Sequence, residues 1–169
     1  MSLHYIIDGY NLIHHPLFAR LNKKTECQEN ALLNFIRVNK LCGKSGSQAT
    51  VVFDGYKDLS RQGFLPADID VVFSRRETAD TRIKRMIEAA ANPKNLVVIS
   101  DDKEIIFFVR QVRAHPMAVE EFLFRSPQGR KLQADQQKKS KSLEEDPGPK
   151  VSYSQMQKIN QEMRKIWLR

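Results

Sequence analysis

The sequence predicts an α/β protein with a mostly parallel sheet, because short apolar runs alternate with helical patterns. Three of these runs end in an acid, at residues 3–11, 49–55 and 96–102. An apolar run of strand length that ends in this way is typical of a buried parallel strand, and parallel strands end at one edge of their sheet. Asp8 alone would serve equally well as a turn residue before Gly9. The repetition instead favours three carboxylates gathered at one edge.

The rest of the chain supplies further helices and strands. Thr25 and Gln28 have the spacing of a capping box, which predicts a helix that runs to about Cys42. His14 and His15 interrupt any regular pattern and are interpreted as loop residues. The later elements are expected to be strands at 49–53, 69–73, 96–99 and about 109–117, with helices at 79–91, around 105–108 and at 119–124.

Size and composition favour one domain with an extension. The chain has 169 residues, of which 41% are hydrophobic, enough for a single core. No run reaches the length of a membrane span, and the first residues lack the pattern of a signal peptide, so we expect a cytoplasmic protein. Cys27 and Cys42 would lie about 22 Å apart in one helix, too far for a disulfide, and are interpreted as reduced packing residues.

The basic charge is concentrated in the last part of the chain. The net charge is +8, and residues 125–169 hold 11 Lys and Arg against 5 Asp and Glu. We expect a domain at 1–125, a basic flexible linker at 126–150 and an amphipathic helix at 151–169. The linker lysines suggest a polyanionic partner, although a solubilising tail has the same composition. These lysines are Lys131, Lys138, Lys139 and Lys141.

The C-terminal segment carries an apolar stripe at helical spacing. Met156, Ile159, Met163 and Trp167 lie on that stripe. It is interpreted as a face that docks on the parent domain, with a partner surface as the alternative. A monomer or a weak homodimer is therefore expected.

A further acid lies at the start of the helix near residue 79. Asp80 precedes Ile83 and Ile87 by three and seven positions, which places it on the apolar face of that helix. Stabilisation of the helix dipole would explain it. If the strand order brings this turn beside the first and fourth strands, Asp80 joins a cluster with Asp8. The other members would be Glu77, Asp101 and Asp102. Such a cluster repels itself unless it holds a cation.

Carboxylate oxygens without cysteine or paired histidine suit Mg²⁺ or Mn²⁺. An ion of this kind activates water and stabilises the charge on a phosphate, so the acids and the basic tail together indicate phosphodiester hydrolysis. The sequence has no Walker-type phosphate loop, no Gly-x-Ser-x-Gly motif and no zinc-ligand spacing.

Four short motifs resemble those of the NYN domain, in its YacP-like branch, which is related to the PIN-domain nucleases. They are Ile7-Asp8-Gly9-Tyr10-Asn11, Val52-Phe53-Asp54, Glu77-Thr78-Ala79-Asp80 and Ser100-Asp101. The resemblance covers residues 3–125. It implies a three-layer α/β/α PIN-like sandwich and a divalent-metal-dependent endoribonuclease. It also implies RNA rather than DNA as the target, with mRNA on the ribosome as one expected context.

The resemblance also assigns roles to single residues. By motif position, Asp8, Asp80 and Asp101 would be the catalytic and metal-binding acids. Supporting positions would be Asn11, Asp54, Glu77, Ser100 and Asp102. The segment after Asp102 is more apolar than the family pattern suggests, so the direct ligand could be either Asp101 or Asp102.

Other functions remain open at this point. The chain could be a non-catalytic RNA- or ribosome-binding protein that keeps the fold, although the presence of all three acids argues against this. A phosphotransfer domain that uses Asp54 as its acceptor fits less well. Besides the lysines of the tail, the domain face with Arg75, Arg76, Arg82 and Arg85 is a candidate for RNA contacts.

Overall fold

The structure is a computed structural model that describes residues 2–22, 27–43, 46–55, 68–144 and 157. The chain divides into two compact units, Met1–Gln133 and Ala134–Arg169. The expected C-terminal helix at 151–169 lies outside the described residues except for Gln157. Within the part of the chain that is described, no helix combines the length and the apolar character that a membrane span needs.

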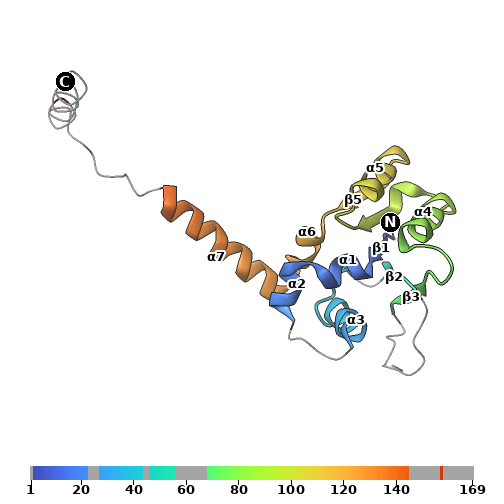
Figure 1. Cartoon of the computed structure of the whole chain (residues 1–169), viewed down its shortest axis with the longest axis horizontal. Helices are drawn as coiled ribbons and strands as arrows, with labels where there is room; N and C mark the ends of the chain where they lie inside the picture. The colour runs from blue at the N-terminus through green and yellow to red at the C-terminus, as the bar shows by residue number, and fades with distance from the viewer. Residues whose placement is uncertain (1, 23–26, 44–45, 56–67, 145–156, 158–169) are drawn as a thin grey trace, which may run out of the picture. The chain divides into compact units, whose positions relative to one another are not determined.

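A five-stranded, entirely parallel sheet forms the centre of the first unit (Figure 1). Its order is β3-β2-β1-β4-β5, and Ile7 of β1 lies opposite Val51 of β2 and Ile99 of β4. This confirms the predicted fold class. The strands are β1 (His4–Asp8), β2 (Gln48–Phe53), β3 (Asp70–Phe73), β4 (Leu96–Ile99) and β5 (His115–Met117).

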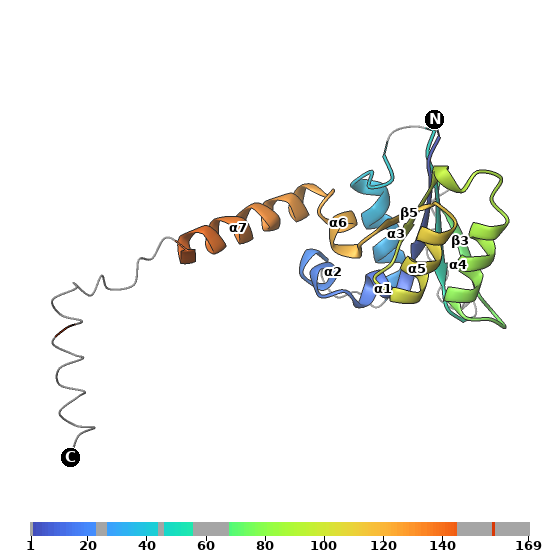
Figure 2. The same cartoon turned by 90° about the horizontal axis from the view of Figure 1, so that it is seen from above.

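Helices cover both faces of the sheet. They are α1 (Gly9–His14), α2 (Pro16–Leu21), α3 (Gln28–Val38), α4 (Ala79–Glu88), α5 (Lys103–Gln111) and α6 (Val119–Leu123), with a short 3₁₀ turn at Pro93–Asn95. Helix α7 (Pro127–Glu144) follows α6 in the chain. Successive strand residues point to opposite faces, so Ile7 packs with α1, α2, α3 and α6, whereas Ile6 packs with α4 and α5. Figure 2 shows the sheet between these two layers.

Two expected element boundaries are wrong. The predicted strand at 109–117 is only His115–Met117, because α5 continues to Gln111 and buries Val109 on the same face as Ile105. The helix expected to reach Cys42 ends at Val38. Cys27 occupies its N-cap position without a side-chain capping hydrogen bond, Cys42 follows the helix, and the two cysteines do not form a disulfide. In each case an apolar run fits a strand or a helix equally well, and packing decides between them.

The segment expected to be a linker is helical over most of its length. Helix α7 covers Pro127–Glu144, where the sequence reading placed a linker without secondary structure. The segment lacks an apolar stripe, but Gln, Lys, Ala, Leu and Glu are all good helix formers. Lys131 and Lys138 are exposed on this helix. Lys139 and Lys141 also belong to it, but their side chains lie outside the described part.

Candidate active site

Four aspartates line one open pocket of about 620 Å³ at the carboxyl edge of the sheet. Asp8 ends β1, Asp54 follows β2, Asp80 lies in the first turn of α4 and Asp102 caps α5. From β1 the chain adds β2 and β3 on one side, and it then adds β4 and β5 on the other side of β1, so the strand order reverses between β1 and β4. Open α/β sheets bind ligands outside the strand ends at such a point. We call this cavity the acid pocket.

Asp8 is the most buried of these acids, with 6% of its surface exposed. Its Oδ1 accepts a hydrogen bond from the Asn11 backbone N at 3.1 Å and so caps α1, and its Oδ2 accepts one from Ser100 Oγ at 3.4 Å. Burial raises the pKa of Asp8 above its ordinary value, and the charges of Asp80 and Asp102 raise it further. The hydrogen bonds from Asn11 and Ser100 lower this pKa but do not cancel the rise.

Asp80 faces the same pocket from the other helical layer. Burial raises the pKa of its carboxyl group, and the charge of Asp102 raises it further, with smaller contributions from Glu104 and Asp54. Lys84 lowers the pKa of Asp80, but its Nζ also lies 3.1 Å from Glu104 Oε2, to which it is hydrogen-bonded. Negative charge in the pocket is therefore only partly balanced by the described side chains.

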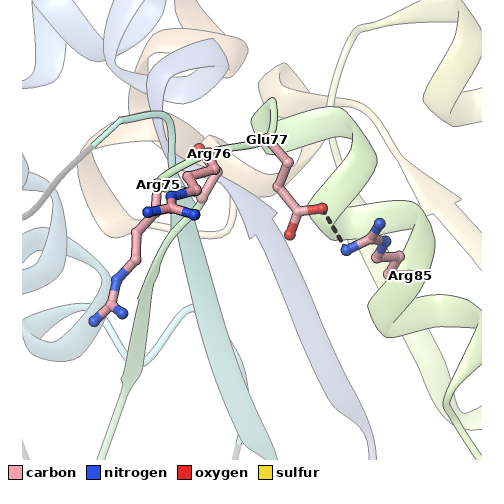
Figure 3. Close-up of a pocket in the computed structure, with 5 residues that line it drawn as sticks. Arg75, Arg76, Glu77 and Arg85 are labelled. Carbon is pink, nitrogen blue, oxygen red and sulfur yellow. Dashed lines mark ion pairs between the residues drawn. The ribbon is translucent and has the colours of Figure 1, made fainter.

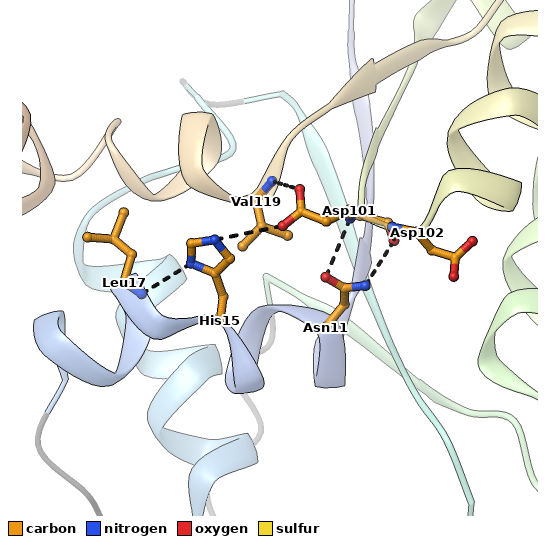
Figure 4. A network of polar contacts seen from close by, with 7 residues as sticks. Asn11, His15, Leu17, Asp101, Asp102 and Val119 are labelled. Carbon is orange, nitrogen blue, oxygen red and sulfur yellow. Dashed lines mark hydrogen bonds and ion pairs between the residues drawn. The ribbon is translucent and has the colours of Figure 1, made fainter. Parts of the chain in front are cut away.

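Asn11 and Ser100 fix the loop after β4 against α1 (Figure 4). Ser100 is buried, and its Oγ accepts hydrogen bonds from Asn11 Nδ2 at 3.4 Å and from the Asp102 backbone N at 3.1 Å. Asn11 Oδ1 accepts a hydrogen bond from the backbone N of Asp101, also at 3.4 Å. Together with the bond from Ser100 to Asp8, these contacts set the separation between the ends of β1 and β4.

The neighbouring acids Asp101 and Asp102 point in different directions (Figure 4). Asp101 Oδ1 accepts a hydrogen bond from the Val119 backbone N at 3.0 Å, and its Oδ2 lies 3.8 Å from His15 Nε2. Asp102 lines the acid pocket, and its Oδ1 caps α5 by accepting hydrogen bonds from the next turn. The structure thus brings Asp102, not Asp101, to the pocket with Asp8 and Asp80.

Comparison with known proteins places the chain in a family. The model of the YacP-like NYN domain matches residues 5–165. The chain belongs to the YacP-like NYN domain family. This membership supports an RNA-related, nuclease-like function. The chain matches no curated protein sequence.

Solved structures of this family share the fold. The chain is similar to Rae1 (YacP) from Bacillus subtilis, with a TM-score of 0.57, 21% sequence identity, and coverage of 98% of this chain and 95% of that chain. A mutant of the same protein gives a TM-score of 0.55, 19% identity, and coverage of 89% of each chain. The α/β arrangement described above is therefore that of known YacP structures.

Glu77, expected to support the acidic cluster of this NYN domain, lies in a separate pocket (Figure 3). Its Oε2 is 2.9 Å from Arg85 Nη1 and its Oε1 is 3.6 Å from Arg82 Nη1. The charge of Glu77 is thus balanced by arginine, and its side chain is not among the described residues that line the acid pocket. Arg82 and Arg85, expected to contact RNA, each lie within ion-pair distance of Glu77.

The side chains of the acid pocket are of the type that binds a divalent ion, but they do not converge as closely as the ligands of a bound ion. Among the described residues, no three side chains of His, Cys, Asp or Glu lie close enough together to hold a metal ion. The pocket nevertheless offers oxygen ligands from Asp8, Asp80 and Asp102, and burial, together with the charges of neighbouring acids, raises the pKa values of the first two. Hard oxygen ligands with excess negative charge are the donor set that Mg²⁺ and Mn²⁺ prefer.

Two aromatic residues of the pocket were missed in the sequence. The rings of Tyr10 and His14 lie 6.0 Å apart at 20° to each other, and both residues line the acid pocket. Tyr10 also meets Phe53 edge to face at 5.5 Å. Tyr10 and His14 are four residues apart, the spacing of neighbours on one helix face. The interpretation of His14 as a loop residue conceals this spacing in the sequence.

Proposed function

We propose that the protein is a divalent-metal-dependent endoribonuclease that hydrolyses RNA phosphodiester bonds at the acid pocket. The observation that carries the proposal is the convergence of Asp8, Asp80 and Asp102 from three separate elements on one pocket. Burial and mutual repulsion raise the pKa values of Asp8 and Asp80, an arrangement that costs stability without a cation. Such perturbed groups in a cleft are typical of functional sites.

The pocket would hold Mg²⁺ or Mn²⁺ through Asp8, Asp80 and Asp102, and Asp54 lines the same pocket. When bound, such an ion supplies an activated water and neutralises charge on the scissile phosphate. Asn11 and Ser100 keep Asp8 and Asp102 at a fixed separation through their hydrogen bonds. The acids themselves would otherwise repel a polyanion, so binding of RNA at this pocket requires the cation.

The RNA strand needs cationic contacts outside the acid pocket. We assign these to the exposed lysines of α7 and to arginines at the same edge of the sheet. The family resemblance favours mRNA in a translation context as the target.

A non-catalytic RNA-binding protein is the second candidate. The observation that favours it is that no three potential ligands converge closely enough to hold an ion among the described side chains. In that case the acids would be a remnant of the fold.

One experiment separates the two candidates. Purified protein is incubated with a mixed RNA pool in Mg²⁺, Mn²⁺ or EDTA, beside the variants Asp80→Asn and Asp70→Asn. Asp70 is an exposed acid that serves as the matched control. It begins β3 and so lies at the amino ends of the strands, whereas the acid pocket lies at their carboxyl ends. Cleavage that needs the metal, is lost in Asp80→Asn and persists in Asp70→Asn supports the nuclease. Metal-independent binding without cleavage supports the alternative.

A further inference from the structure

We propose that a second pocket, beside β3, is a phosphate subsite that binds a phosphodiester next to the scissile one on the same single-stranded RNA. This inference rests on the proposed function for its substrate. The cavity has a volume of about 610 Å³ and is lined by Ser74, Arg75, Arg76, Glu77 and Arg85 (Figure 3). We call it the arginine pocket.

The arginine pocket has an excess of positive charge. Glu77 is the only acid among the described residues that line it, and its ion pair with Arg85 uses that charge. Arg75 and Arg76 are exposed, and the described residues provide neither with an ion-pair partner. Two guanidinium groups therefore remain for an external anion. Arginine presents a planar fork of donors that matches phosphate oxygens.

Glu77 is a positioning residue on the α4 side of this pocket. Its side chain is only 18% exposed and contacts both Arg82 and Arg85. The contact with Arg85 is close but lacks hydrogen-bond geometry, and Arg82 Nε is a buried donor without a described acceptor. Glu77 therefore holds Arg85 at this side of the pocket by charge rather than by a hydrogen bond.

The backbone of Arg75 is held in an unusual conformation. Its φ is 59°, in the left-handed region that side chains other than Gly and Asn rarely adopt. Its N–H donates a hydrogen bond to the Gly55 carbonyl at 2.8 Å, and the preceding Ser74 N–H donates one to Phe53 at 2.9 Å. The ends of β2 and β3 thus fix the direction in which the Arg75 side chain leaves the turn. Strain of this kind at a pocket rim is a reason to test for function.

The two pockets are adjacent. Ser74 Oγ, in the arginine pocket, donates a hydrogen bond of 2.7 Å to Asp54 Oδ1, in the acid pocket. Glu77 of the arginine pocket is followed directly by Thr78, which lines the acid pocket. One RNA strand can therefore reach both pockets. The acid pocket takes its phosphate through a cation, whereas the arginine pocket takes the neighbouring phosphate directly.

The test compares two double variants. Arg75→Asn with Arg76→Gln removes both unpaired charges, and Asn is chosen because it tolerates a positive φ. The matched control is Arg110→Gln with Arg113→Asn. Arg113 has a φ of 61°, and both arginines are exposed. Arg110 lies in the last turn of α5, and Arg113 follows that helix before β5 begins. The two variants thus lose equal charge and change one left-handed arginine each. Thermal melting verifies that both fold.

Binding is measured by fluorescence anisotropy with a short labelled oligouridylate in EDTA, so that no cleavage occurs. We expect the Arg75/Arg76 variant to bind about tenfold more weakly, with a log–log salt slope shallower by about 1.4, from two contacts at about 0.7 each. The control should change far less. Equal losses in the two variants, or none in the first, would overturn the subsite. Displacement of the oligonucleotide by an equal concentration of inorganic phosphate would show a site for free anions instead.

Cleavage assays keep this proposal separate from the nuclease proposal. In the presence of metal, the Arg75/Arg76 variant should raise KM for long RNA and leave cleavage of a dinucleotide, which has a single phosphodiester, unchanged. If Asp80→Asn still cleaves RNA while the arginine variant loses binding, the assignment of cleavage to the acid pocket fails and the arginine pocket stands as an RNA-binding site. If Asp80→Asn is inactive but the arginine variant binds normally, the subsite fails and the nuclease assignment stands.

Discussion

The acid pocket and the arginine pocket lie at the same edge of the sheet but balance their charges differently. In the arginine pocket, the one acid is paired with arginine at 2.9 Å. In the acid pocket, Asp8 and Asp80 face other acids, and their pKa values rise. A paired charge is explained by the fold, whereas like charges gathered in a partly buried pocket require an external partner. The comparison therefore favours Asp80, rather than Glu77, as the acid that serves the proposed nuclease activity.

The largest effect is expected from removing one charge of the acid pocket. Asp80→Asn should lower RNA cleavage by at least about 100-fold, because even indirect changes at metal sites cost 10- to 100-fold. The corresponding change Glu77→Gln should act mainly on RNA binding. Gel-based cleavage rates at saturating RNA would measure both. Equal losses of cleavage rate in the two variants would remove the distinction between the pockets.

Metal ions should stabilise the protein through the acid pocket alone. At about 100 times the dissociation constant, Mn²⁺ would add roughly 2.7 kcal/mol to the free energy of unfolding. Thermal melts with and without Mn²⁺ would show this as a rise in Tm for the wild type and the Arg75/Arg76 variant. Asp80→Asn should show little or no rise. A full rise in Asp80→Asn would place the ion elsewhere.

Substitution of the two consecutive acids after β4, Asp101 and Asp102, should have different effects on stability and on metal binding. Asp101→Ala removes the acceptor for the Val119 N–H at the start of α6 and should cost about 1 kcal/mol of stability, as the loss of a helix cap does. Metal affinity should be kept. Asp102→Ala should weaken both the α5 cap and Mn²⁺ binding. Calorimetric titration of Mn²⁺ separates the two, and loss of affinity in Asp101→Ala would restore Asp101 as a ligand.

Stability should also depend on pH through Asp80. Its pKa in the folded protein is raised from 3.8, so the folded protein binds more protons than the unfolded chain between 3.8 and the raised value. The wild type therefore loses stability relative to Asp80→Asn as the pH rises through this window. The variant should be the more stable protein at pH 7, and the difference should disappear below pH 3.8. Urea unfolding at several pH values would test this in metal-free buffer.

The smallest effect is expected from the lysines of the tail. Exchange of Lys131, Lys138, Lys139 and Lys141 for Gln should flatten the salt dependence of RNA binding by about 0.7 per lost contact. Cleavage at saturating RNA should not change. An unchanged slope would leave RNA binding to the arginine pocket.

Most residues of the acid pocket are predictable from the sequence because they lie at the ends of strands or at the start of a helix. Asp8, Asp54 and Asp80 were found from apolar runs and helix periodicity, which fix where a residue lies in a parallel sheet. The orientation of Asp101 was not predictable. It depends on the Val119 N–H at the start of α6, from which Asp101 accepts a hydrogen bond, and α6 is brought near only by tertiary packing.

The pairing of Glu77 was hidden for a similar reason. Arg85 lies eight positions away, and the two meet because the turn before α4 folds back beside that helix. Helical segment α7 was missed because its sequence lacks an apolar stripe, although its composition favours a helix. Local signals thus gave the sheet and its acids, while contacts between distant segments decided which charges are paired.

Gly9 shows how closely the site is joined to the core. A Cβ placed on Gly9 would lie 2.3 Å from a ring carbon of Phe53, which is fully buried between the sheet and α1. The glycine is therefore required for space. In a genetic screen, loss of function in Gly9→Ala should be suppressed by Phe53→Leu, a change distant from it in the sequence. A larger residue at position 9 is tolerated only with a smaller one at position 53. Among related proteins, we therefore expect substitutions at these two positions to occur together.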